Sequence, residues 1–149
     1  MQIRKSTAED GEMLVSIWRS AVADTHSFVT REDLAAIDLE VQQFLPETPA
    51  WLALDELGQP IAFMVLAGGS IEALFVAGDQ QGRGAGRALV EHAMRGSASI
   101  TTVVNEQNDQ AVGFYRQLGF ELVARSPTDE QGRLYPILHM KRERAKADR

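Results

Sequence analysis

The chain has 149 residues, 44% hydrophobic and 24% charged, which is the balance of a soluble globular protein long enough to bury one core. We therefore expect a single domain over residues 1–149. The net charge of −6 argues against nucleic acid as a partner, because nucleic-acid-binding proteins usually carry a basic face. The absence of cysteine excludes disulfides, a cysteine-ligated metal and a cysteine acyl-enzyme.

The sequence also lacks the signals of a secreted or membrane protein. No apolar run approaches the roughly 18–20 residues that a membrane-spanning helix requires. Residues 1–5 lead into a charged segment with helical spacing, so they lack the apolar core of a secretory signal. We therefore expect a cytoplasmic protein without membrane contacts. Basic residues crowd the C-terminus, and about residues 142–149 are expected to form a flexible, solvated tail.

The first half of the chain predicts a strand, two helices and two further strands. Apolar residues such as Leu14, Ile17 and Ala21 recur at helical spacing, and a second helical pattern ends at Pro46. Two short apolar runs follow, joined by a connection short enough for an antiparallel hairpin. The predicted elements are a strand over 2–5, helices over about 8–23 and 31–45, and strands over 51–54 and 61–66.

The second half alternates strands and helices and then ends in two strands. The predicted elements are a strand over 71–76, a helix over 87–94, a strand over 100–104, a helix over about 111–118, and strands over 120–124 and 134–140. The order βααβββαβαββ is typical of a three-layer α/β fold built on a mixed sheet. The run 134–140 is expected to be an exposed last strand, whose edge could pair across the two-fold axis of a homodimer.

A glycine-rich segment joins strand 71–76 to the next helix, with the sequence Gln81-Gly82-Arg83-Gly84-Ala85-Gly86-Arg87. Glycine lets the backbone approach an anion closely, and the first N–H groups of a helix lack partners and favour negative charge. The segment therefore predicts a site for a phosphate-bearing ligand. It is not a nucleotide P-loop, because no lysine follows the glycines, and its glycine spacing does not match the dinucleotide fingerprint. The spacing that it does have is Gln-x-x-Gly-x-Gly.

This spacing resembles the coenzyme A pyrophosphate loop of the GNAT superfamily of N-acetyltransferases. The resemblance extends to a second motif, Asn108-x-x-Ala111-x-x-Phe114-Tyr115-x-x-x-Gly119-Phe120, and the order of elements matches over nearly the whole chain. The resemblance implies a small bacterial single-domain member whose mixed sheet splays between its fourth and fifth strands. A ligand would then lie between residues 74–76 and residues 103–105.

The resemblance also implies that acetyl-CoA is the acyl donor and that no metal is required. The side chain of Asn108 can cap the following helix or bind the pantetheine arm, and the two roles can coexist. Arg83 and Arg87 can add positive charge beside the pyrophosphate. The expected coenzyme-binding residues are Leu74, Phe75, Val76, Gln81, Gly82, Arg83, Gly84, Ala85, Gly86, Arg87, Asn105, Asn108 and Tyr115.

Transfer to an amine requires that the amine first lose a proton. A lysine-like amine with a pKa of about 10.4 is neutral only about one time in 10³ at pH 7, a cost of roughly 4–5 kcal/mol. Glu72, on the predicted strand 71–76, resembles the position where many relatives place a carboxylate base; it could equally be a surface glutamate. His26, between the first two helices, is the rival candidate for the base. The alternative is that His26 is an ordinary turn or capping histidine without a catalytic role.

Departure of the thiolate calls for a proton donor, and Tyr115 matches the tyrosine of the family's second motif. It would protonate the coenzyme sulfur. Tyr115 also falls on the apolar face of its helix, so packing in the core is the other reading.

The sequence thus predicts an acetyl-CoA-dependent N-acetyltransferase in which an amine attacks the bound thioester directly. The acceptor is a primary amine of a small molecule or a peptide, and no motif in the first two helices identifies it. The alternative is a non-catalytic acyl-CoA-binding sensor or regulatory module, and a third reading is a partner-binding domain without a cofactor.

Overall fold

The computed structural model describes residues 1–25 and 27–144, and its strands and helices follow the predicted order βααβββαβαββ. The helices are α1 (Gly11–Thr25), α2 (Arg31–Phe44), α3 (Ala85–Arg95) and α4 (Asp109–Gln117). The strands are β1 (Gln2–Lys5), β2 (Trp51–Leu54), β3 (Pro60–Ala67), β4 (Ser70–Val76), β5 (Ser99–Asn105), β6 (Glu121–Ser126) and β7 (Ile137–Glu143). Short 3-10 helices are η1 (Ala8–Asp10), η2 (Leu45–Glu47) and η3 (Gly78–Gln80).

The strands form one seven-stranded sheet in the order β1-β2-β3-β4-β5-β7-β6. β4 and β5 pair in parallel, with Ser70 opposite Thr101 and Ile71 opposite Thr102, whereas β5 and β7 pair antiparallel. The predicted mixed sheet is therefore confirmed. Contacts divide the chain into two compact units: the first unit comprises residues 1–66 and 73–92, and the second comprises 67–72 and 93–149.

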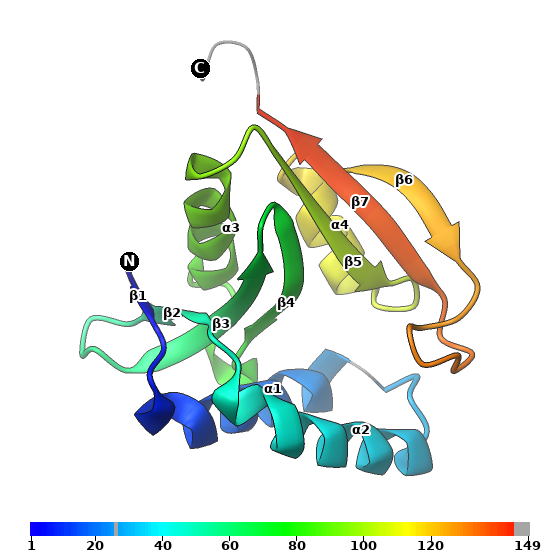
Figure 1. The fold of residues 1–149 in the computed structure, drawn as a ribbon, viewed down its shortest axis with the longest axis horizontal. Helices are drawn as coiled ribbons and strands as arrows, with labels where there is room; N and C mark the ends of the chain where they lie inside the picture. The colour runs from blue at the N-terminus through cyan, green and yellow to red at the C-terminus, as the bar shows by residue number, and fades with distance from the viewer. Residues whose placement is uncertain (26, 145–149) are drawn as a thin grey trace. The chain divides into compact units, whose positions relative to one another are not determined.

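The core of the first unit forms where α1 packs on strands β2 and β3. Leu14, Ile17 and Trp18 share one face of α1 and are buried with Leu52 and Phe63 of the strands. α2 lies beside α1 (Figure 1) and packs partly buried side chains against the same cluster. The helical spacing read from the sequence thus marks the buried face of α1.

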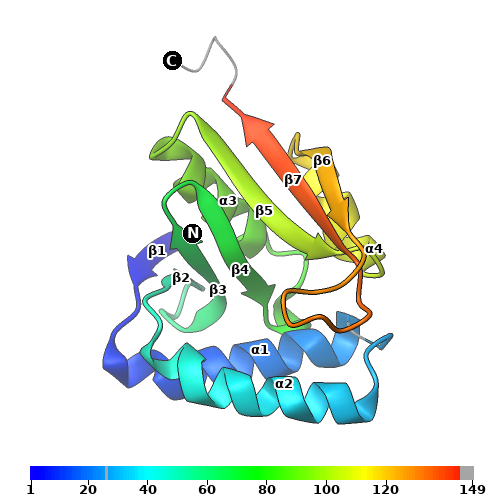
Figure 2. The same cartoon turned by 45° about the vertical axis from the view of Figure 1, so that its right-hand side comes forward.

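The second unit contains the strands β5, β7 and β6, which lie side by side with α4 on one face (Figure 2). Alternate residues of β5 are buried, namely Ile100, Thr102 and Val104. Thr102 lies near the Tyr115 hydroxyl of α4, so this buried face of β5 is the one that meets the helix. The two faces of β5 therefore differ, and α4 covers the apolar one.

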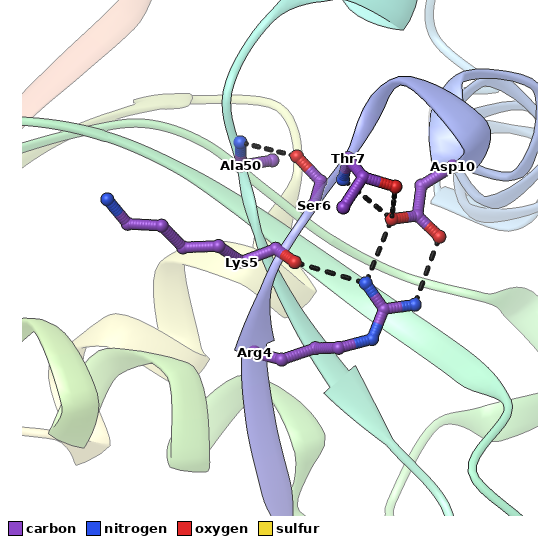
Figure 3. Close-up of polar contacts among 6 residues, drawn as sticks. All are labelled: Arg4, Lys5, Ser6, Thr7, Asp10 and Ala50. Atoms are coloured by element: carbon purple, nitrogen blue, oxygen red, sulfur yellow. Dashed lines mark hydrogen bonds and ion pairs between the residues drawn. The ribbon is translucent and has the colours of Figure 1, made fainter.

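A polar cluster links the end of β1 to the start of α1 (Figure 3). Arg4 donates two hydrogen bonds to the Asp10 carboxylate, at 2.9 and 3.0 Å. The same carboxylate accepts the backbone N–H of Thr7 at 2.8 Å, and the Ser6 hydroxyl accepts the N–H of Ala50 at 2.9 Å. One carboxylate thus closes the turn before α1 and fixes the end of β1.

The last strand differs from the prediction. It begins at Ile137 rather than at residue 134, and it lies between β5 and β6, so it is not an exposed edge. The strands at the ends of the sheet order are β1 and β6. β7 also continues into the segment expected to be a tail: Arg142 pairs with Ile100, and the Arg144 N–H donates to Ala98 at 2.7 Å.

None of the helices in residues 1–25 and 27–144 combines the length and the apolar character that crossing a bilayer would need.

Candidate active site

The glycine-rich loop has the open backbone that binding a phosphate would need. Gly82 and Gly84 have φ angles of 80° and 85°, a region that side chains other than glycine rarely adopt. A Cβ atom at either position would meet no atom within 4 Å, so the backbone there faces open space. α3 begins directly after Gly84, and the N–H groups of its first turn have no carbonyl partner within the helix. The loop and helix therefore fit an anionic ligand such as a pyrophosphate.

Polar side chains around this loop hold its shape. The Gln81 amide donates to the Val76 carbonyl at 3.0 Å, which closes the loop onto the end of β4. Arg83 donates to Gln80 at 2.6 Å and pairs with Glu56 at 3.1 Å. The predicted phosphate ligand Arg83 is thus already paired with a carboxylate from the β2–β3 connection.

The second arginine of the loop is also paired. Arg87 contacts Glu91, one turn further along α3, at 3.1 Å. A pocket of about 580 Å³ lies beside these groups within the first unit, between the N-terminal strand, the β2–β3 connection and α3. Both arginines line it, as do Glu56 and Glu91. Any phosphate bound here would have to compete with carboxylates for the two cations.

The predicted site residues of β4 differ in environment. Glu72 is exposed, whereas Leu74, Phe75 and Val76 are half-buried. The Phe75 ring lies 5.7 Å from the ring of Phe63, so this side chain belongs to the core of the first unit. Any contact of Phe75 with a ligand would therefore fall to its backbone.

Tyr115 lies on the inner face of α4 and is 5% exposed. Its ring sits edge-on to Phe114 and to Phe120, with centroid distances of 5.1 Å in both cases. Burial raises the pKa of Tyr115 to about 12, and the nearby Thr102 side chain of β5 opposes this effect only in part. The phenol therefore keeps its proton throughout the physiological range.

Asn108 caps α4. Its side-chain oxygen accepts the Ala111 N–H at 3.1 Å, and the residue is 9% exposed. The capping role that the sequence allowed is confirmed, and the contact with pantetheine stays a prediction. Asn105, the last residue of β5, is half-buried and pairs with Ile137.

Of the three histidines, the proposed base His26 lies outside the described residues. The other two have packing or hydrogen-bond partners. The ring of His92 lies 4.2 Å from that of Trp51, and His139 is 2.9 Å from the Ser126 hydroxyl.

Two neighbours of predicted site residues were not expected from the sequence, Glu56 beside Arg83 and Thr102 near Tyr115. Glu56 lies in a connection far along the chain from Arg83, and no local pattern joins them. Thr102 was only weakly indicated by the sequence. It is a polar residue at a position that strand alternation places on the buried face together with Ile100 and Val104.

The amino-acid sequence of the chain matches a known protein family. The family model for the GNAT acetyltransferase domain matches residues 46–122. The peptidyl-lysine N-acetyltransferase YjaB of Escherichia coli (strain K12) is 46% identical over 140 residues, which cover 94% of this chain and 95% of that protein. YiaC, a peptidyl-lysine N-acetyltransferase of the same strain, is 25% identical over 130 residues, covering 86% of this chain and 88% of its own.

A solved structure agrees with these matches. The solution structure of apo-form YjaB from Escherichia coli superimposes with a TM-score of 0.90 at 46% identity, over 94% of this chain and 95% of the other. The chain therefore belongs to the GNAT acetyltransferases, and it is an N-acetyltransferase that uses acetyl-CoA as its acetyl donor.

Proposed function

We propose that the acceptor of this N-acetyltransferase is the ε-amine of lysine residues in proteins or peptides. The observation that carries the proposal is the 46% identity to a peptidyl-lysine N-acetyltransferase across 94% of one chain and 95% of the other. A match over nearly the full length of both chains includes the segment of α1 and α2. The resemblance to the family implies that this segment forms one wall of the acceptor site.

The lysine amine must be deprotonated before it attacks. Removing its proton costs roughly 4–5 kcal/mol of free energy at pH 7, so a proton acceptor is needed. Glu72 is the described residue that we assign to this role, because its carboxylate is exposed on β4, at the position where relatives place a base. His26 remains the rival candidate.

Tyr115 supplies the proton for the departing sulfur. The support is its place in the second family motif and a pKa raised to about 12, which keeps the phenol protonated until it is used. The backbone of Gly82 and Gly84 and the first turn of α3 hold the pyrophosphate of the donor.

An acceptor panel tests the proposal. The protein is incubated with acetyl-CoA and three kinds of acceptor: lysine peptides with a blocked N-terminus, peptides with a free α-amine but no lysine, and small amines. Thiol release measures turnover. We expect release above background with the lysine peptides and loss of that release in Glu72→Gln or in His26→Gln, whichever side chain is the base. Turnover confined to α-amines or to small amines would contradict the lysine assignment.

A further inference from the structure

Ser20 of α1 contacts the segment that leads from β4 into the glycine-rich loop. Its hydroxyl oxygen accepts the backbone N–H of Gly78 at 2.7 Å, and both residues are half-buried. The two residues are 58 positions apart in the chain, and both belong to the first unit. This hydrogen bond therefore joins α1 to the residue at which η3 begins.

The N–H group of Gly78 needs a partner from outside its own helix. Gly78 is the first residue of η3, and the first N–H groups of a helix have no carbonyl to bind within it. The preceding residue, Ala77, has no side-chain oxygen and makes no capping hydrogen bond. Ser20 thus supplies, from another element, the oxygen that a serine or aspartate before η3 would have supplied.

The segment that Ser20 holds is short and closed on itself. The Gln80 N–H donates to the Ala77 carbonyl at 2.9 Å, and the side chain of Gln81 closes the segment onto the end of β4. Toward β3, the Ala77 N–H donates to the Ile61 carbonyl at 2.9 Å. A segment closed in this way moves as one piece, so the anchors at Ile61 and Ser20 also set where the chain enters the glycine-rich loop.

We infer that Ser20 is a positioning residue for the donor, which holds residues 78–81 so that the loop that follows presents its backbone to the pyrophosphate of acetyl-CoA. The inference rests on the assignment of the pyrophosphate to Gly82 and Gly84 under the proposed function, and it does not depend on the acceptor. Without the hydroxyl, the Gly78 N–H must turn to water, and the loop leaves its binding position more often. The donor then binds only the fraction of molecules in which the loop is in place, which lowers its apparent affinity.

Calorimetry with coenzyme A tests the inference on Ser20→Ala and on Ser16→Ala. Ser16→Ala is the matched control, because it makes the same change about one turn earlier on α1, where the side chain is exposed. Alanine favours a helix at both positions, so α1 should be retained in both variants. We expect Ser20→Ala to raise the Kd for coenzyme A about twofold to tenfold, the value of one ordinary hydrogen bond, and Ser16→Ala to match the wild type.

Two further readouts separate positioning from a general loss of stability. In acetyl transfer, Ser20→Ala should raise the KM for acetyl-CoA and leave kcat near the wild-type value, because a saturating donor keeps the loop in place. Amide hydrogen exchange at Gly78 should become faster in Ser20→Ala and stay unchanged in Ser16→Ala, because only the first variant frees this N–H.

Gly82→Ala distinguishes a failure of the inference from a failure of its premise. If Gly82→Ala binds coenzyme A more weakly while Ser20→Ala binds it as tightly as the wild type, the inference is overturned. Equal weakening in Ser20→Ala and Ser16→Ala would overturn it too, because the effect would then not belong to the bond to Gly78. Unchanged binding in Gly82→Ala would remove the loop from the donor site, and the inference with it, whereas a wrong acceptor assignment would alter none of these binding constants.

Discussion

At the scale of single residues, Asp10 connects local structure to stability. Hydrogen bonds from Arg4 and from the Thr7 backbone hold the pKa of the Asp10 carboxyl well below its ordinary range. Bonds from Arg19 and Gln42 likewise lower the pKa of Asp38 to about 2. Both groups have lower pKa values in the folded than in the unfolded chain, so their stabilisation is present above the unfolded value and is lost as the pH falls through the folded one.

We therefore predict that the free energy of unfolding falls as the pH is lowered from about 5 to 2. Asp10→Asn should cost about 1–2 kcal/mol at pH 7, a modest value because Arg4 is 38% exposed and solvent screens the pair. It should also flatten the acid slope. Urea unfolding at several pH values measures both effects, and a variant with the unchanged wild-type slope would contradict this account.

Tyr115 carries the second prediction at this scale. Tyr115→Phe should lower kcat by about 10²–10⁴-fold, the usual contribution of a positioned proton donor. Coenzyme A binding, measured by calorimetry, should persist because the ring packing is kept. With a pKa of about 12, the wild-type phenol should cause no alkaline loss of kcat below about pH 10. An alkaline limb near neutral pH that disappears in Tyr115→Phe would contradict the assigned environment.

Motifs identified Tyr115 and Asn108 from the sequence, since both stand at fixed places in one local pattern. They could not show that Thr102 lies near Tyr115, because the two residues belong to β5 and α4, and their approach depends on the fold. The same holds for Glu56, whose pairing with Arg83 arises from the fold.

At the scale of elements, local periodicity was enough to predict the order of strands and helices. It was not enough for β7, because the neighbours of a strand are set by non-local pairing. The apolar run 134–140 begins before Pro136, which has no N–H to donate, and the ladder with β5 starts only at Ile137. A dimer formed by strand pairing would therefore have to use β1 or β6, the ends of the sheet order.

The glycine loop gives a prediction at this scale with a matched control. Gly82 and Gly58 both have a φ of 80°, and a Cβ atom at either would meet nothing within 4 Å. Alanine at either position should therefore cost a similar, small amount of stability, about 1–2 kcal/mol of backbone strain. Gly82→Ala should also raise the KM for acetyl-CoA, whereas Gly58→Ala, in the β2–β3 connection, should not. Equal KM values for the two variants would show that the loop does not hold the donor.

At the scale of the whole molecule, the negative charge is concentrated in one part of the chain. Residues 8–47, which run from η1 to η2, contain nine aspartates and glutamates and two arginines. This excess of seven negative charges is larger than the net charge of the full chain, −6. An acidic segment of this kind attracts cationic partners and repels anionic ones.

We therefore predict that salt weakens the use of cationic acceptors. At saturating acetyl-CoA, kcat/KM for a peptide whose acceptor lysine is flanked by further lysines should fall several-fold as the ionic strength rises, because counterions screen the attraction. A control peptide with glutamines in the flanking positions should change little. The same salt dependence for both peptides would show that the charge of this segment does not steer the acceptor.

Acetyl transfer to the lysine ε-amine can be tested in a single competition experiment. A single peptide with a free α-amine and one internal lysine is incubated with acetyl-CoA and the protein, and fragment-ion mass spectrometry locates the acetyl group. We expect enzyme-dependent acetylation of the lysine ε-amine, strongly reduced with Tyr115→Phe. Acetylation of the α-amine alone, or none at all from a protein that binds coenzyme A, would contradict it.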